Sequence, residues 1–143
     1  MLMADKQFTK LSDRLKAMTA LQKTPIEYGP EDYDMLIVDG IKGLYVDLNK
    51  SAEYRKEFDE QNLCFLNGKE LLISEEEYIL LKAHLNFYKI IQADVNNIIG
   101  YSTDSLTVTN ADKPYANIAN EMERIEKRLI DLFFKVRLES GSA

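Results

Sequence analysis

Apolar side chains recur every three or four residues in four stretches of this chain, and charged or polar residues fill the positions between them. Such spacing is typical of amphipathic helices that bury one face. In the first stretch, residues 5–22, the apolar positions are Phe8, Leu11, Leu15, Met18 and Leu21. The pattern predicts an N-terminal helix within residues 1–25, ended by the prolines and the glycine of residues 23–30.

A second helix is predicted over residues 30–48. Proline is favourable in a first helical turn, and the two acidic residues after it favour the positive end of the helix dipole. The apolar face of this helix consists of Tyr33, Leu36, Ile37, Ile41, Leu44, Tyr45 and Leu48. Gly40 and Gly43 lie inside it, and each costs about 1 kcal/mol relative to alanine. We expect them to form a flat surface on which another helix packs closely; a hinge is the alternative.

The segment that follows is more polar. Residues 51–61 contain Tyr54 and Phe58 one helical turn apart, which predicts a short surface helix. Asn67 and Gly68 come next, and both residues tolerate the positive φ angles of a hairpin turn. The apolar runs beside them are short, so a short β-hairpin and an irregular loop both remain open.

Ser74 opens the third predicted helix, because its hydroxyl can cap a backbone N–H group while Glu77 reaches back to complete a capping box. Gly100 is a suitable end for this helix. The helix is apolar on several sides, as expected for a helix at the centre of a core. Its apolar residues are Tyr78, Leu80, Leu81, Leu85, Phe87, Tyr88, Ile90, Ile91, Val95 and Ile98.

The fourth predicted helix starts near Lys113 or Pro114, with Asp112 as its N-cap. Its apolar residues alternate three and four positions apart over about three heptads. They are Tyr115, Ile118, Met122, Ile125, Leu129, Leu132 and Val136, and Ile130, Phe133, Phe134 and Leu138 widen the apolar side near the end. Packing against a helix of the same chain is favoured over a coiled coil between chains.

Together these elements predict a mainly α fold, a small helical bundle in which two long antiparallel helices are joined by a long extended loop, residues 100–113. Two shorter helices pack against this pair. No repeat, low-complexity segment or linker divides the chain, so we expect residues 1–143 to form one domain. The domain comprises the N-terminal helix within residues 1–25, a core of residues 30–138 and a flexible tail of residues 139–143.

Composition narrows the classes of function. The 143 residues carry a formal net charge of −6, with a sequence pI of about 4.9, so net attraction to nucleic-acid phosphate is not expected. The single cysteine, Cys64, cannot form an intrachain disulfide and suits a reducing compartment. The start lacks the features of a secretory signal, and no run reaches the roughly 20 apolar residues of a membrane span. We expect a protein of the cytoplasm without a membrane partner.

Residues that could carry catalysis are sparse. His84 is the only histidine, and Cys64 lies in an apolar run, so the two cannot supply the four ligands of a zinc site. The three glutamates of residues 75–77 occupy consecutive helix positions and point in different directions. No glycine-rich phosphate-binding motif is present. The sequence therefore predicts a non-enzyme without a cofactor or a metal, and its eight tyrosines favour contact surfaces over chemistry.

Three segments taken together resemble a known family. They are EDYDMLIVDGIKGLYVDLN, ELLISEEEYILLKAHLNFYKIIQADVNNI and YSTDSLTVTNADKPYANIANEMERIEKRL, and the resemblance covers residues 30–138. Its carriers are Tyr33, Asp34, Leu36 and Ile37, then Leu72 with the acidic turn of residues 74–77, then the Ser/Thr-rich residues 105–115. In this order they resemble the head–tail connector proteins, also called adaptor or neck proteins, of long-tailed bacteriophages and prophages.

The resemblance implies a structural role. Proteins of this family form a ring, usually of twelve copies, between the portal protein of the capsid and a downstream neck or tail-terminator protein. The expected partners are therefore other copies of this chain and those two proteins, and the expected place is the virion neck, with the host cytoplasm during assembly. DNA passes through the lumen of such a ring, and a negative wall would repel its phosphates.

The resemblance also suggests two contact regions. An extended strand at residues 105–109 could pair with a neighbouring subunit, and we expect a subunit interface or a channel-facing surface made of Ser105, Leu106, Thr107, Val108, Thr109 and Tyr115. The C-terminal segment, residues 137–143, is expected to reach the portal protein through Arg137, Leu138 and Glu139. An end of the chain without any role is the alternative for this segment.

Other classes remain open. A small helical DNA-binding regulator would need a helix–turn–helix, which does not stand out, and the acidic pI disfavours it. An accessory subunit of an enzyme would carry clustered His, Cys or Asp residues, and no such cluster is found. Another phage neck protein, a tail-completion protein or a scaffold would share the location but differ in architecture.

Overall fold

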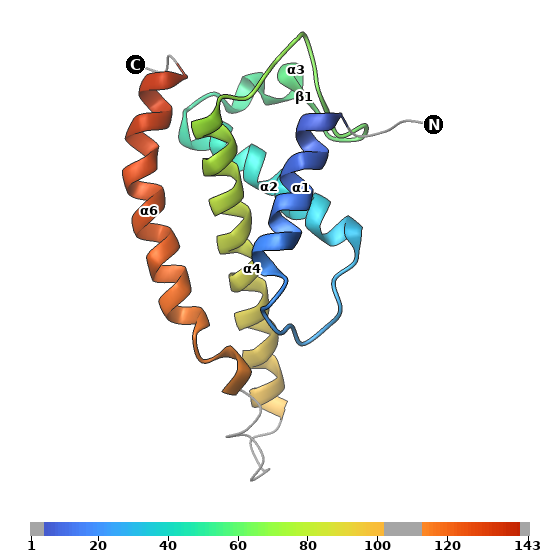
Figure 1. Ribbon diagram of the computed structural model, residues 1–143, viewed down its shortest axis with the longest axis vertical. Coiled ribbons are helices and arrows are strands. Elements are labelled where there is room, and N and C mark those ends of the chain that lie inside the picture. Colours follow the sequence, from blue (N-terminus) through green and yellow to red (C-terminus); the bar gives the residue numbers. More distant parts are fainter. Residues whose placement is uncertain (1–4, 102–112, 141–143) are drawn as a thin grey trace.

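Two long antiparallel helices form the framework of the molecule. The computed structural model describes residues 5–101 and 113–140, and within them α4 (Ile73–Tyr101) runs through the middle (Figure 1). α6 (Ile118–Glu139) lies antiparallel to α4 along one side. The mainly α fold with two long antiparallel helices is therefore confirmed, whereas their connection, residues 102–112, falls outside the described residues.

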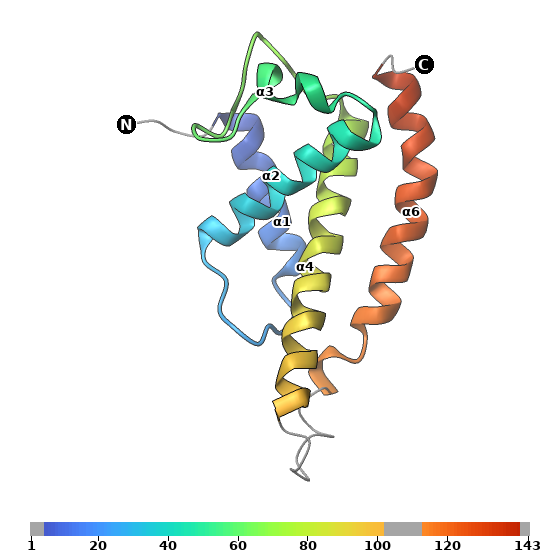
Figure 2. The ribbon, with the colours of Figure 1, turned by 180° about the vertical axis from the view of Figure 1, so that it is seen from behind.

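Two shorter helices cover the other side of α4. They are α1 (Lys6–Thr19) and α2 (Pro30–Asp47). Both views place α1 and the start of α2 away from α6, whereas α2 crosses α4 and its C-terminal end reaches toward the end of α6 (Figures 1 and 2). All four helices contribute to one apolar core, whose fully buried members include Phe8, Leu11, Leu15, Ile37, Ile41, Leu44, Ile79, Phe87, Ile91, Ile118, Ile125 and Val136. Burial of the predicted apolar faces therefore explains why these segments fold as helices against one another.

α2 crosses α4 closely at the two glycines. A Cβ atom on Gly40 would lie 2.8 Å from the backbone oxygen of Ile79, and one on Gly43 would lie 2.8 Å from Cε of Lys82. α2 continues as a helix through both residues. The expected flat packing surface is confirmed, and the helix has no hinge at this point.

α1 is shorter than the predicted residues 5–22. Asp5 caps it, since Oδ1 accepts a hydrogen bond from the backbone N–H of Phe8 at 2.8 Å, and the helix ends at Thr19. Met18 is 41% exposed, and Leu21 lies beyond the helix and is fully exposed. The last two positions of the predicted apolar face are therefore wrong.

The segment between α2 and α4 contains four short elements. These are η1 (Ser51–Glu53), α3 (Tyr54–Glu57), β1 (Phe58–Asp59) and β2 (Cys64–Phe65). β1 and β2 pair antiparallel, with Phe58 opposite Phe65. The predicted helix over residues 51–61 is thus too long, because its second aromatic residue belongs to a strand, and both of its aromatic side chains are buried.

The hairpin is present, but its turn is not at the predicted dipeptide. The turn between the strands is residues 60–63, whereas Asn67 and Gly68 form a separate turn after β2. Their φ angles are 59° and 70°, and the N–H of Lys69 donates to the carbonyl of Leu66 at 3.0 Å. The dipeptide therefore has the positive φ angles expected of it, but its turn follows β2 and does not connect the two strands.

The start of α4 differs from the predicted capping box. The helix begins at Ile73, and Oε1 of Glu75 accepts a hydrogen bond from the N–H of Leu72 at 2.9 Å. Ser74 is buried inside the first turn, and Glu77 pairs with an arginine of α6. The predicted capping box is displaced by two residues, because the glutamate that accepts from the N–H three residues earlier is Glu75 and not Glu77. At the other end α4 extends past the glycine predicted to end it.

α6 begins later than expected. A 3₁₀ turn, η2 (Lys113–Tyr115), precedes it, and Asn117 is the N-cap, so the predicted start near Lys113 or Pro114 is early by a turn. The predicted N-cap, Asp112, lies outside the described residues. The inward positions of the heptad pattern pack against α4, with Ile118, Ile125, Leu129, Leu132 and Val136 buried, so packing within one chain is confirmed for them.

The end of α6 corrects the predicted flexible tail. The helix continues to Glu139, and the N–H of Ser140 donates to the carbonyl of Val136 at 2.9 Å. Glu139 therefore belongs to the last helical turn, and Ser140 is hydrogen-bonded to it, so the first two residues of the predicted tail are fixed by the fold. Residues 141–143 fall outside the described part of the chain.

Candidate functional site

The outward face of α6 carries an apolar row that the described chain leaves uncovered. Its members are Ile130, Phe134 and Leu138, which are 63%, 61% and 80% exposed. A spacing of four residues places them on one side of the helix. We call them the outer row of α6. The inward heptad positions already fill the core, so the outer row lies largely outside the packing of the described residues.

A shallow groove between α4 and α6 borders the outer row. Its volume is about 370 Å³, and its lining is Tyr78, Lys82, Glu126, Leu129, Ile130, Phe133 and Phe134. The rings of Phe133 and Phe134 meet edge to face, with centroids 5.6 Å apart. Lys82 and Tyr78 both contact Asp47 of α2, and Lys82 does so at 3.1 Å. The polar groups of Tyr78 and Lys82 are thus engaged by the fold, and the apolar side chains of the groove extend the surface of the outer row.

A second exposed surface lies on the opposite flank. It is formed by residues 26–39, which include the first half of α2, and both views place this part away from α6 (Figures 1 and 2). Ile26 and Met35 are each 60% exposed there. The ring of Tyr28 anchors the segment by packing against Phe87 with centroids 5.3 Å apart. Burial, helped by nearby Asp94 and Asp32, raises the pKa of the Tyr28 hydroxyl to about 12.

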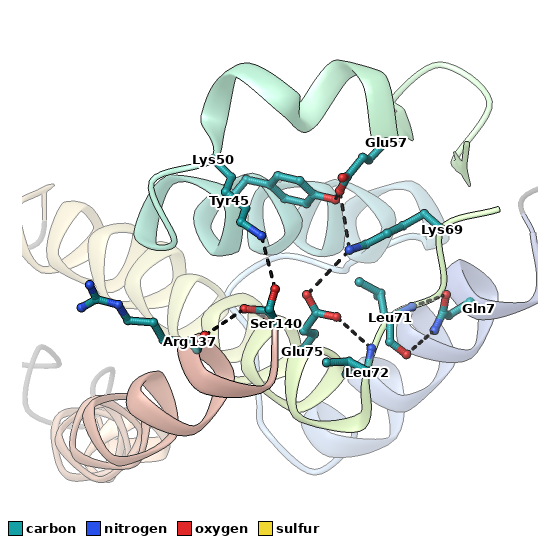
Figure 3. Close-up of polar contacts among 10 residues, drawn as sticks. All are labelled: Gln7, Tyr45, Lys50, Glu57, Lys69, Leu71, Leu72, Glu75, Arg137 and Ser140. Atoms are coloured by element: carbon teal, nitrogen blue, oxygen red, sulfur yellow. Dashed lines mark hydrogen bonds and ion pairs between the residues drawn. The ribbon is translucent and has the colours of Figure 1, made fainter. Parts of the chain in front are cut away.

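A polar cluster holds the end of the bundle together (Figure 3). The hydroxyl of Tyr45 on α2 donates to Glu57 of α3, and Nζ of Lys69 lies 3.6 Å from Glu57 and 4.0 Å from Glu75. Glu75 is almost fully buried, so the lysine offsets the cost of removing its charge from water. The cluster therefore has a structural explanation that needs no substrate.

The same end of the molecule fixes the residues predicted to contact a portal protein. Nζ of Lys50 donates to the carbonyl of Ser140 at 3.4 Å, and Oγ of Ser140 donates to the carbonyl of Arg137 at 3.5 Å (Figure 3). Arg137, Leu138 and Glu139 are exposed. They lie on a helix end tied to the residues after α2, and their contact with a partner stays a prediction.

The predicted subunit-interface residues are mostly outside the described chain. This holds for Ser105, Leu106, Thr107, Val108 and Thr109. Tyr115 is described, and it is partly buried against the core beside Val95 and Ile118. The strand-pairing hypothesis thus stays a prediction, and Tyr115 offers only part of its ring to a neighbour.

His84 and Cys64 lie apart and in different settings. His84 is buried on α4, stacked on the ring of Tyr88 at 4.7 Å, and its Nε2 has no hydrogen-bond partner among the described residues. Burial, together with the nearby Arg124, lowers its pKa. Cys64 lies on β2, where burial and two aspartates raise the pKa of its thiol. A thiol held protonated is a poor nucleophile.

Two further observations concern metal binding and membrane insertion. Within residues 5–101 and 113–140, no group of three or more His, Cys, Asp or Glu side chains could hold a metal ion. No helix in that same part of the chain is long and apolar enough to cross a membrane. The candidate site that the described residues offer is the exposed apolar surface of α6 and its groove.

The sequence predicts part of this surface. It identifies the outer row as apolar residues outside the heptad pattern, but it places them on the core side of the helix. The signal that separates the two sets is the four-residue spacing from Ile130 to Leu138, which drifts away from the inward positions.

Comparisons with protein-family models, with curated proteins and with solved structures find no match to this chain.

Proposed function

We propose that this chain is a structural protein that assembles with copies of itself into a ring, as a head–tail connector of a bacteriophage or prophage. The observation that carries the proposal is the outer row of α6, three large apolar side chains that no described residue covers. Scattered exposed apolar residues are normal, but a row beside an apolar groove is typical of an interaction site. The resemblance of residues 30–138 to connector proteins supplies the kind of assembly.

The fold also suits such a role. α4 is held on one side by α6 and on the other by α1 and the first half of α2, so the molecule has two different flanks (Figures 1 and 2). A ring needs two unlike surfaces on each subunit, since every copy contacts one neighbour with each flank. In the proposed neck position, the portal protein and a downstream neck or tail-terminator protein bind the two open faces of the ring.

Electron microscopy and sedimentation of the purified protein test the proposal. We expect rings for the wild type and their loss in an Ile130→Ser/Phe134→Ser variant, because both serines remove apolar area from the contact. Ile90→Ser is the matched control, since Ile90 is 43% exposed on α4 and lies outside the outer row. A wild-type protein that stays monomeric at every concentration, also in the presence of portal protein, would overturn the proposal.

A gel-shift assay distinguishes the proposed function from the main alternative, a small DNA-binding regulator. A DNA-binding regulator would retard duplex DNA at low salt, whereas an acidic ring subunit should leave it unretarded.

A further inference from the structure

The two flanks of the molecule carry opposite charge. Residues 26–39 contain five acidic residues and no basic one: Glu27, Glu31, Asp32, Asp34 and Asp39. Residues 127–138, the C-terminal half of α6, contain one acidic residue, Asp131, and four basic ones: Lys127, Arg128, Lys135 and Arg137. We call these segments the acidic flank and the basic flank. They lie on opposite sides of α4 (Figures 1 and 2).

Each flank combines its charge with exposed apolar side chains. On the acidic flank, Glu31, Met35 and Asp39 are spaced by four residues on α2, and all three are exposed. On the basic flank, Lys127 and Lys135 accompany the outer row of α6 and are exposed as well. Lys127 pairs with Glu123 of the same helix at 3.2 Å, and Arg128 pairs with Glu77 of α4, whereas Lys135 forms no ion pair with a described residue. The apolar side chains of the acidic flank are thus accompanied by acidic residues alone, whereas the outer row of α6 has its basic neighbours together with the exposed Glu126 and Asp131.

The fold leaves most of the acidic charge unused. None of the five acidic residues of the acidic flank forms an ion pair with a described residue. Asp32 caps α2 through the N–H of Gly29 at 2.7 Å, and Asp34 accepts from the hydroxyl of Ser12 at 2.7 Å. Glu27, Glu31 and Asp39 are therefore the members best placed to meet a partner.

We propose that the acidic flank of one copy binds the basic flank of the next, so that copies of this chain associate head to tail. The inference deepens the proposed function and rests on it. A contact between two basic flanks or two acidic flanks would place like charges opposite each other, which disfavours a symmetric dimer. Two complementary surfaces on opposite sides of one subunit give a repeating contact, which closes into a ring when the rotation per copy allows it.

Charge reversal on each flank tests the inference. The acidic-flank variant is Glu31→Lys/Asp39→Lys, and the basic-flank variant is Lys127→Glu/Lys135→Glu. The substitutions avoid Asp32 and Asp34, which bond within the fold. Lys127→Glu removes an exposed pair with Glu123 one turn away, and such surface pairs contribute little to stability. We expect each variant, folded by circular dichroism, to need roughly tenfold or more protein than the wild type to assemble, as measured by analytical ultracentrifugation.

Mixing the two variants gives the decisive result. In an equimolar mixture, both contacts of an alternating assembly pair opposite charges again, so assembly should return at nearly the wild-type concentration. Damage to the fold could not be repaired by mixing. The inference is overturned if the wild type assembles and the variants assemble equally well, or if the mixture stays as impaired as its components. A wild type that never assembles instead overturns the proposed function.

Discussion

Gly40 and Gly43 show how two identical residues on one helix face different obstacles. A Cβ atom at Gly40 meets a backbone oxygen, that of Ile79, whereas one at Gly43 meets the end of the flexible Lys82 side chain. Backbone cannot move without shifting α4 relative to α2, but a lysine side chain can turn aside. The two positions should therefore differ in how strongly they respond to the same substitution.

We expect Gly40→Ala to lower the free energy of unfolding by about 1–3 kcal/mol, the usual cost of overpacking a core contact. Gly43→Ala, the matched control, should leave it within about 1 kcal/mol of the wild type, since alanine favours the helix by up to about 1 kcal/mol. Urea unfolding followed by circular dichroism measures both. Equal effects at the two positions would contradict the close backbone contact at Gly40.

His84 makes stability depend on pH. Its folded-state pKa is lowered, first by burial and then by Arg124, with Glu121 opposing, so the unfolded chain binds the proton more readily. Stability should therefore be complete above the unfolded pKa of about 6.5 and should fall as the pH drops from there toward the folded pKa. Thermal melts across this range measure the slope.

A His84→Leu variant isolates this contribution. Leucine cannot titrate and leaves no buried Nε2 without a partner, so the variant should lose less stability than the wild type between pH 7 and pH 5, an interval chosen to bracket about 6.5. Carboxylates titrate in both proteins and cancel in the comparison. Identical slopes for the two proteins would show that the imidazole is not excluded from water.

At the scale of single elements, α6 separates residues that stabilise the fold from residues that do not. Ile125 is 1% exposed on its inward face, and Ile130 is 63% exposed in the outer row. Ile125→Ala should cost about 2–5 kcal/mol of unfolding free energy, and Ile130→Ala should stay within about 0.5 kcal/mol for the monomer. Chemical unfolding at a concentration below assembly gives both values. A large cost at Ile130 would mean that the outer row packs within the chain.

The sequence predicted elements better than their ends. The heptad pattern of α6 and the acidic first turn of α2 each predict a helix, because many residues in each segment favour the same structure. Ends depend on one or two hydrogen bonds, such as that from Leu72 N–H to Glu75, and several residues in a row could have made them. Phe58 fitted a helix by its distance from Tyr54, and only its pairing with Phe65 places it in a strand.

The candidate surface was harder to predict than the fold. Apolar periodicity tells which residues could be buried, but it does not say which of two adjacent faces the core will take. In α6 the core takes the face of Leu129 and Leu132 and leaves Phe134 outside. The opposition of the two charged flanks arises only after folding, when α2 and α6 come to lie on different sides of α4.

At the scale of the whole molecule, salt should act on assembly through the charged flanks. Raising the salt concentration from about 0.1 M to about 1 M shortens the Debye length from about 10 Å to about 3 Å. Wild-type assembly should then need more protein, whereas either charge-reversed variant should assemble more readily, because the same screening weakens its repulsion. Sedimentation at the two salt concentrations shows the sign. A shift in the same direction for all three proteins would point to apolar contacts alone.

Asp5 joins the first helix to the small hairpin. Besides capping α1, its Oδ2 accepts from the N–H of Phe65 at 2.7 Å, and its own N–H donates to the carbonyl of Leu63 at 3.2 Å. Two backbone groups at the outer border of the hairpin, the N–H of Phe65 and the carbonyl of Leu63, are thus bonded to a residue of the same chain. A strand from another copy of the chain, such as residues 105–109, could add to this sheet edge only by displacing Asp5. Because Asp5 also caps α1, its displacement would unwind the first turn of that helix.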